Sequence, residues 1–337
     1  GDAGDGEAYL GQAIYRKPVD PDLVFHQSVL VERVFRGKVN QFFFSEDVEQ
    51  LTVDSLTRLT GESANRMGVL GWELGGHLRL EERNNRTNYW NEFAYAFDIR
   101  EGRRFSTPEA FPGYLAPGAV EDAGGRSWYL PSSAFSTPET TDSRLRQAGL
   151  YGDMSQSFEN GWSLALTLRG DWVGVEAAEP GDLAGESLLS DRDSVRLLSG
   201  ALSLSREWNT GLVYLTAGLY RGIAGNTVGD GVNLYGDGKL NRDDFLNRTR
   251  LLEIGGHQRV RETLTINWAL FDQRRQRQEF FGSNDIEVRG GEVSLDWQPV
   301  SSTRVLLNGQ YLDAHYNNAA PAEFGGGSLW NVYAPGA

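Results

Sequence analysis

The sequence predicts an all-β protein, an antiparallel transmembrane β-barrel or a segment of one. Apolar and polar residues alternate over stretches of about eleven residues, and charged residues stand in the middle of these stretches. The connections between the stretches alternate between short and long. Strands of this length exceed the five or six residues common in globular proteins, and about ten residues are needed to cross a bilayer at a tilt.

The clearest predicted strand runs from Leu70 to Leu80. Its even-numbered residues are apolar or glycine, whereas its odd-numbered residues include Glu73 and Arg79, which is the period of two expected for a strand. Because a sandwich core does not hold unpaired mid-strand charges, the polar face is predicted to be in water. The same alternation recurs at 162–172, 264–270, 291–297 and 305–311.

The pattern before residue 144 is less regular. Strands are expected at 25–44 with a turn at Arg36-Gly37-Lys38, and at 51–59, 67–82 and 89–99. The next segment, 100–143, is rich in Pro, Gly, Ser and Thr and is longer than compact domains usually accommodate. We predict that it forms a large surface loop.

From residue 144 onward the connections differ systematically in length. Short turns are expected at 159–161, where Asn160-Gly161 is a hairpin signal, and at 207–211, 258–262 and 298–302. Transmembrane barrels have short periplasmic turns and longer extracellular loops, so the long segments are predicted to be extracellular. Counting the one already described, these long loops are 100–143, 175–194, 222–247, 274–285 and 317–337.

Aromatic residues near the strand ends agree with a bilayer, where such rings lie at the level of the lipid headgroups. Rings that cap a soluble core explain the same pattern equally well. The residues concerned are Tyr89, Trp90, Trp162, Trp208, Trp297 and Tyr316.

The composition excludes several classes of protein. The 337 residues include 46 acidic and 32 basic side chains, so the net charge is −14, which disfavours a nucleic-acid partner. The absence of cysteine excludes disulfides and thiolate sites, and the four histidines form no metal-binding motif. No run approaches the roughly 18 apolar residues of a membrane-spanning helix. We predict no catalytic, metal or cofactor site, because no nucleophile or phosphate-loop motif is present.

Three groups of residues are candidates for binding. Tyr114, Trp128 and Tyr129 are predicted ligand-binding rings, although packing of the loop against itself is the better-supported interpretation. The segment from Asn233 to Asp244 approximates a calcium loop but lacks the usual terminal Glu, so a solvated turn is favoured. The arginines Arg274, Arg275 and Arg277 are predicted to contact lipopolysaccharide phosphates. The alternative interpretation is that they form the charged base of a loop.

Two stretches resemble TonB-dependent outer-membrane receptors. Residues 143–172 resemble a hairpin from the middle of the barrel, and residues 248–318 resemble its late strands. The second resemblance rests on the order and spacing of several short sequence motifs. They are an E-x-G element at Glu253 to Gly255, an ALF strand at Ala269 to Phe271, an R-G-x-E strand at Arg289 to Glu292, a Trp-and-Pro turn at Trp297 to Pro299, and a Tyr-bounded strand at Tyr311 to Tyr316.

The resemblance implies a partial segment, about ten to twelve strands, of a 22-stranded barrel in a Gram-negative-type outer membrane. It also implies uptake of a scarce solute, such as a siderophore-type metal chelate, a cobamide or a glycan. The implied partners are outer-membrane lipid, that ligand, and a TonB-type energy-transducing protein acting through a plug. The plug and the last barrel strand are expected to be absent from this chain. The alternatives are a plugless passive channel and a secreted β-sandwich that binds carbohydrate.

Overall fold

The computed structural model describes most of the chain. The described residues are 3–39, 44–89, 119–121, 127–130, 140–183, 188–223, 232, 234, 238–240, 242–279 and 282–317. The segment predicted as a strand at 89–99 lies outside them from residue 90 onward, as does Tyr114.

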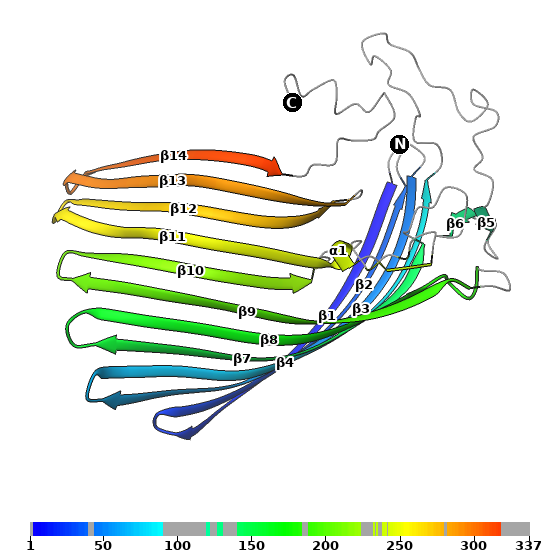
Figure 1. The fold of residues 1–337 in the computed structure, drawn as a ribbon, viewed down its shortest axis with the longest axis horizontal. Coiled ribbons are helices and arrows are strands. Elements are labelled where there is room, and N and C mark those ends of the chain that lie inside the picture. Colours follow the sequence, from blue (N-terminus) through cyan, green and yellow to red (C-terminus); the bar gives the residue numbers. More distant parts are fainter. Residues whose placement is uncertain are drawn as a thin grey trace, which may run out of the picture.

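Twelve long strands form one antiparallel sheet in the order β1-β2-β3-β4-β7-β8-β9-β10-β11-β12-β13-β14 (Figure 1). In the first half they are β1 (Ala3–Asp20), β2 (Leu23–Val39), β3 (Phe44–Asn65), β4 (Gly68–Tyr89), β7 (Thr141–Phe158) and β8 (Trp162–Ala178). In the second half they are β9 (Ser190–Trp208), β10 (Gly211–Ile223), β11 (Leu246–Arg261), β12 (Leu264–Glu279), β13 (Gly282–Val300) and β14 (Thr303–Asn317).

The remaining elements are small. β5 (Ala119–Glu121) and β6 (Ser127–Tyr129) form a two-stranded sheet, and α1 (Arg242–Phe245) is a single helical turn. No helix in the described part of the chain is long and apolar enough to span a membrane. The all-β prediction and its expected strand number are therefore confirmed.

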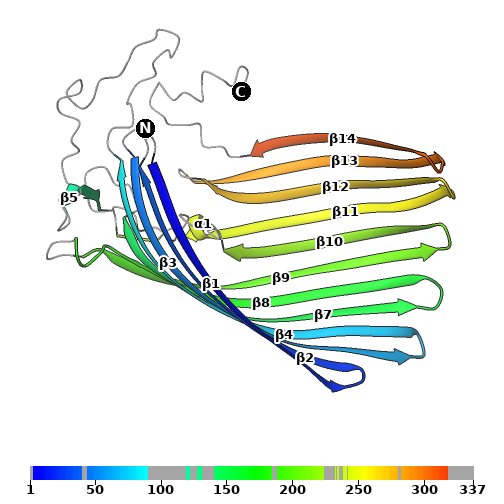
Figure 2. The same ribbon diagram turned by 180° about the vertical axis from the view of Figure 1, so that it is seen from behind.

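The sheet is curled and open. The two views show β1 to β4 turned away from the direction of β11 to β14 (Figures 1 and 2). Within the described residues, β1 and β14 are the edges, each paired on one side only. The long strands form one sheet and not two stacked sheets, which is against the β-sandwich alternative.

Several predicted boundaries are corrected. The expected turn at Arg36-Gly37-Lys38 is wrong, because β2 continues through it paired with β1 and β3. Gly37 serves a close approach instead, since a Cβ there would lie 2.4 Å from Oδ1 of Asp5. The expected loop at 274–285 is mostly strand, because β12 and β13 pair as far as Glu279 opposite Gly282.

The loops predicted at 175–194 and 222–247 are shorter than expected. β8 extends to Ala178 and β9 begins at Ser190, while β11 begins at Leu246. The hairpin at Asn160-Gly161 is confirmed, with Gly161 at φ 82° and its N–H donating to the carbonyl of Phe158 at 3.1 Å. A positive φ of this size favours glycine.

The two faces of the sheet differ in character. One, the apolar face, presents exposed leucines from neighbouring strands, and the other, the polar face, carries most of the mid-strand charges. Exposed fractions on the apolar face reach 60% for Leu78, 74% for Leu150, 52% for Leu168 and 63% for Leu198. Contiguous exposed apolar surface of this extent marks an interaction site.

All six tryptophans whose side chains are described lie on the apolar face by register. They are Trp72, Trp162, Trp172, Trp208, Trp268 and Trp297. On β8 the apolar face runs from Trp162 to Trp172, which is 172 − 162 = 10 residue steps. At about 3.3 Å per residue and a tilt of about 45°, this gives a height of about 23 Å, close to the band of about 25 Å in outer-membrane barrels.

Candidate functional site

The centre of the polar face carries a hydrogen-bonded network of charged side chains. His77 on β4 places its Nε2 2.8 Å from Oδ2 of Asp54 on β3, and Nη2 of Arg169 on β8 lies 3.0 Å from its Nδ1. These side chains meet because alternation and register put odd residues of β4 and β8 on the same face as even residues of β3. The network therefore joins strands that are far apart in the sequence.

Asp171 anchors this network. Its side chain is only 2% exposed, and it accepts two hydrogen bonds from Arg169, from Nε at 2.7 Å and Nη2 at 2.8 Å. Gln147 on β7 donates a further bond at 2.8 Å. Gly149 makes room for the carboxylate, since a Cβ there would lie 2.3 Å from its Oδ1. Each charge is partnered, so the network is suited to lining a wet, polar wall.

A tyrosine and an E-x-G element pair in the same way at two places on the polar face. Tyr151 lies over Gly75 and donates to Oε1 of Glu73 at 2.7 Å, and a Cβ on Gly75 would meet the ring at 2.3 Å. Tyr214 on β10 repeats this with the element from Glu253 to Gly255 on β11, again donating at 2.7 Å. Each glycine is thus covered by the ring from the neighbouring strand.

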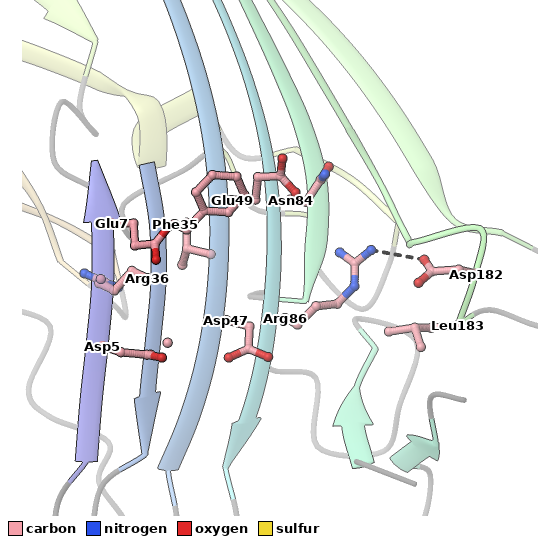
Figure 3. Close-up of a pocket in the computed structure, with 13 residues that line it drawn as sticks. Asp5, Glu7, Phe35, Arg36, Asp47, Glu49, Asn84, Arg86, Asp182 and Leu183 are labelled. Carbon is pink, nitrogen blue, oxygen red and sulfur yellow. Dashed lines mark hydrogen bonds and ion pairs between the residues drawn. The ribbon is translucent and has the colours of Figure 1, made fainter. Parts of the chain in front are cut away.

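A pocket of about 630 Å³ lies at the loop end of β1 to β4 (Figure 3). Arg86 bridges it, with Nη1 2.7 Å from Asp142 and Nη2 3.0 Å from Asp182 in the β8–β9 connection. By alternation Arg86 lies on the same face of β4 as Leu78, so the pocket belongs to the part of that face beyond the apolar band. Its acidic lining is Asp5, Glu7, Asp47, Glu49 and Asp182.

The predicted ligand rings are only partly placed. Trp128 and Tyr129 lie on β6, opposite Val120 and Ala119 of β5, and nothing is described of their side chains. Their role as ligand contacts stays a prediction. Five positions of the predicted calcium loop lie outside the described residues, namely Asn233, Tyr235, Gly236, the central acid Asp237 and Asn241. Within the described parts of the chain, no group of three acidic or histidine side chains is arranged to hold a metal ion.

The connection between β10 and β11 packs onto the loop end of the polar face. Leu234 and Phe245 are almost completely buried, at 0% and 1% exposure, in one cluster with Val173 and Val175. The sequence pattern predicts a polar loop here, because the separated apolar residues Val232, Leu234 and Phe245 give no periodic signal in a glycine-rich segment. The polar face is therefore closed over by protein at this end of β8 and β9.

Two aspartates of β9 tether this connection beyond the apolar band. Arg242 of α1 donates a hydrogen bond to Asp193, with Nη2 2.8 Å from Oδ1. This bond is the largest of the causes that lower the pKa of Asp193. The backbone N–H of Leu240 donates to Asp191 at 3.0 Å and is the main cause that lowers the pKa of that carboxyl. Both carboxylates are thus stabilised in their charged form.

No protein-family model matches the sequence, and no curated protein matches it. Solved structures match the fold over nearly the whole chain. The siderophore receptor PiuA from Acinetobacter baumannii has a TM-score of 0.64 at 13% identity, covering 93% of this chain and 47% of its own.

Two transporters match similarly. The ferric citrate transporter FecA has a TM-score of 0.64 at 13% identity, covering 94% of this chain and 43% of its own. The copper transporter OprC has a TM-score of 0.62 at 14% identity, covering 94% and 48%. The chain thus spans about half the length of these three solved structures, which are described as a receptor and two transporters. Its open twelve-stranded sheet has the fold of part of the barrel of TonB-dependent outer-membrane receptors, as the resemblance in its sequence predicts.

Proposed function

We propose that this chain forms part of the barrel wall of an outer-membrane receptor that takes up a scarce solute. The observation that carries the proposal is the contrast between the two faces of one sheet. Exposed leucines such as Leu150 require a nonaqueous neighbour, whereas the network around Asp171 and His77 lies on the opposite side of the same strands. A bilayer outside and a hydrated lumen inside satisfy both faces.

The solute that we propose is a siderophore-type metal chelate, a cobamide or a glycan, with energy supplied by a TonB-type protein through a plug domain. The support is the shared fold with structures described as a siderophore receptor, a ferric citrate transporter and a copper transporter. Tyr114, Trp128 and Tyr129 are the proposed ligand contacts on the loop side. Their planar rings suit an aromatic chelate.

Membrane insertion is tested by tryptophan fluorescence. The full chain is reconstituted in lipid whose acyl chains carry bromine near the bilayer centre, which quenches nearby tryptophans. Trp268 lies midway along the apolar face of β12, between Leu264 and Leu270. We expect strong quenching in the parent chain and less in Trp268→Phe. Equal quenching by an aqueous quencher in the presence and absence of lipid would show that the apolar face is not in a bilayer.

Uptake is tested in cells that produce the full-length receptor containing this chain. A labelled ferric chelate should enter against its gradient, and an uncoupler of the inner-membrane proton gradient should abolish entry. Entry that an uncoupler leaves unchanged would favour the passive-channel alternative. Failure to enter under both conditions would remove metal chelates from the proposed substrates.

A further inference from the structure

Four arginines face each other in register on the apolar face. Arg221 of β10 is directly opposite Arg248 of β11, and Arg250 of β11 is directly opposite Arg274 of β12. Like charges directly opposite on one face of a sheet are destabilising. The charge of Arg248 is repelled by Arg250, Arg221 and Arg274, and Asp285 offsets part of this repulsion. An anion between these side chains would relieve this repulsion.

The carboxylates of the protein supply only part of that negative charge. Arg274 is paired with Asp285 at 2.5 Å and Glu287 at 3.2 Å. Among the residues whose side chains are described, no carboxylate forms an ion pair with Arg221, Arg248 or Arg250. The Nε of Arg248 is also shielded from solvent without a hydrogen-bond partner in the described structure. Three guanidinium groups therefore stand together with donors available.

The two arginines of β7 on the apolar face near this height are paired. Arg144 of β7 pairs with Glu82 of β4 at 3.1 Å, and Arg146 lies 3.8 Å from Glu176 of β8. The positive excess therefore lies at β9 to β11, where Arg196 of β9 is on the apolar face as well. It is not a general feature of the rim.

An apolar groove begins directly beside the arginines. It has a volume of about 580 Å³, and its apolar walls include Leu215, Leu252, Leu270 and Tyr311. The charged residues Asp272, Arg289 and Asp313 also line it, and Asp272 pairs with Arg289 at 2.8 Å. Gly291 has no side chain, and Leu270 lies over it, since a Cβ there would be 2.6 Å from Cδ2 of Leu270. Leu252 follows Arg250 by two residues on the same face, so the groove continues the arginine cluster toward the apolar band.

We propose that Arg221, Arg248 and Arg250 bind the phosphate of a membrane lipid whose acyl chain lies in the groove beside Leu252. The inference rests on the proposed function, because it requires the apolar face to be in a bilayer. Guanidinium groups bind phosphate through two parallel charge-assisted hydrogen bonds. A free phosphate ion satisfies the arginines alone, whereas a lipid occupies the groove as well. Two of the arginines predicted from the sequence to contact phosphate can now be placed. Arg274 borders the cluster, and Arg275 lies on the polar face.

The test compares lipids that share acyl chains and differ in headgroup charge. The full chain in neutral maltoside micelles is titrated with dioleoyl phosphatidic acid, dioleoyl phosphatidylcholine or inorganic phosphate, and bound lipid is counted by native mass spectrometry. The variant Arg248→Gln/Arg250→Gln removes two cluster charges. Its matched control, Arg259→Gln/Arg261→Gln, removes two charges from the turn end of the same strand.

We expect the parent chain and the control to bind phosphatidic acid at least about tenfold more tightly than phosphatidylcholine, a difference of about 1.4 kcal/mol. The cluster variant should lose that preference. Arg248→Lys/Arg250→Lys should retain part of it, because charge remains without the planar donor fork. If the cluster variant misfolds, Arg221→Gln provides the same readout.

Three results would overturn the inference. They are equal binding of the two lipids, an equal loss in the control variant, and binding of inorganic phosphate that is as tight as that of phosphatidic acid. The last would leave an anion site without a lipid. Failure of brominated lipid to quench Trp268 contradicts the proposed function instead, so the two failures are distinguishable.

Discussion

At the scale of single residues, burial decides how much a charged side chain contributes to stability. Asp171 is held by Arg169 and Gln147 with a side chain that is 2% exposed, whereas Asp296 pairs with Arg304 with 35% of its side chain exposed. Removing one partner of a buried pair leaves a charge that water does not solvate. Exposed pairs are solvated in both the folded and the unfolded state, so they contribute little to the free energy of unfolding.

Asp171→Asn should therefore lower the free energy of unfolding by about 3 kcal/mol, the lower end of the range for a broken buried pair, because Arg169 remains partly exposed. Urea titration of the chain in lipid measures this. The control Asp296→Asn removes the same charge from an exposed pair and should have a far smaller effect. Equal losses in the two variants would show that the polar-face network does not support the fold.

Adjacent residues on one strand test the two faces. Leu202 of β9 is 49% exposed on the apolar face, and Ala201 points to the polar face. Leu202→Arg should cost about 2 to 4 kcal/mol in lipid, because arginine is expensive on the lipid side of a barrel. Ala201→Arg should cost much less, since its charge enters a hydrated region. The free energies of unfolding are compared in the same lipid, and the reverse order would contradict the assignment of the faces.

At the scale of elements, the connection between β10 and β11 depends on both packing and charge. Phe245 and Leu234 are buried against β8, and Asp191 and Asp193 hold Leu240 and Arg242. The pKa values of both carboxyls are lowered from the ordinary 3.8. Their stabilising contribution is therefore fully present above that value and is lost as the pH falls through the lowered values.

Acidification should accordingly loosen this connection. Amide hydrogen exchange in 238–245 should accelerate as the pH is lowered from about 6 to about 3, after correction for the intrinsic exchange rate. The double variant Asp191→Asn/Asp193→Asn should exchange rapidly throughout, with little dependence on pH. A parent-like pH dependence in this variant would assign the effect to other groups.

At the scale of the whole molecule, the open sheet makes the strands unequal. In the described residues β1 and β14 are bonded on one side only, whereas β7 and β8 are bonded on both. Pro18 lies in β1, and proline is accepted at a sheet edge because it has no N–H to donate. The edge strands therefore have backbone groups available for pairing with a further strand.

Hydrogen exchange of the isolated full chain should reveal this difference. Alternate amides of β14, those directed away from β13, should exchange much faster than amides in β7 and β8. The amides of β14 that bond to β13 are the internal control. Uniform protection along β14 would show that this edge is paired, and crosslinking of a Tyr311→Cys variant then distinguishes pairing within one chain from pairing between copies.

Local patterns in the sequence are enough to predict the strand class, the two faces and the tight turns from residue 159 onward, because alternation and the Asn160-Gly161 signal are local. It placed Glu73, Arg169 and Asp171 on the polar face but not the contacts that they make. It misplaced a turn at Gly37, because glycine marks either a turn or a close approach.

Which side chains meet across strands follows from the folded structure and not from the local pattern. The contact of His77 with Arg169 joins residues 92 positions apart, and the opposition of Arg221 and Arg248 depends on the register of β10 against β11. The burial of Leu234 and Phe245 could not be predicted from the sequence either, because an irregular segment has no hydrophobic periodicity. A shift of register by one residue moves every side chain to the other face, so the chemistry of both faces follows from long-range pairing that no local pattern specifies.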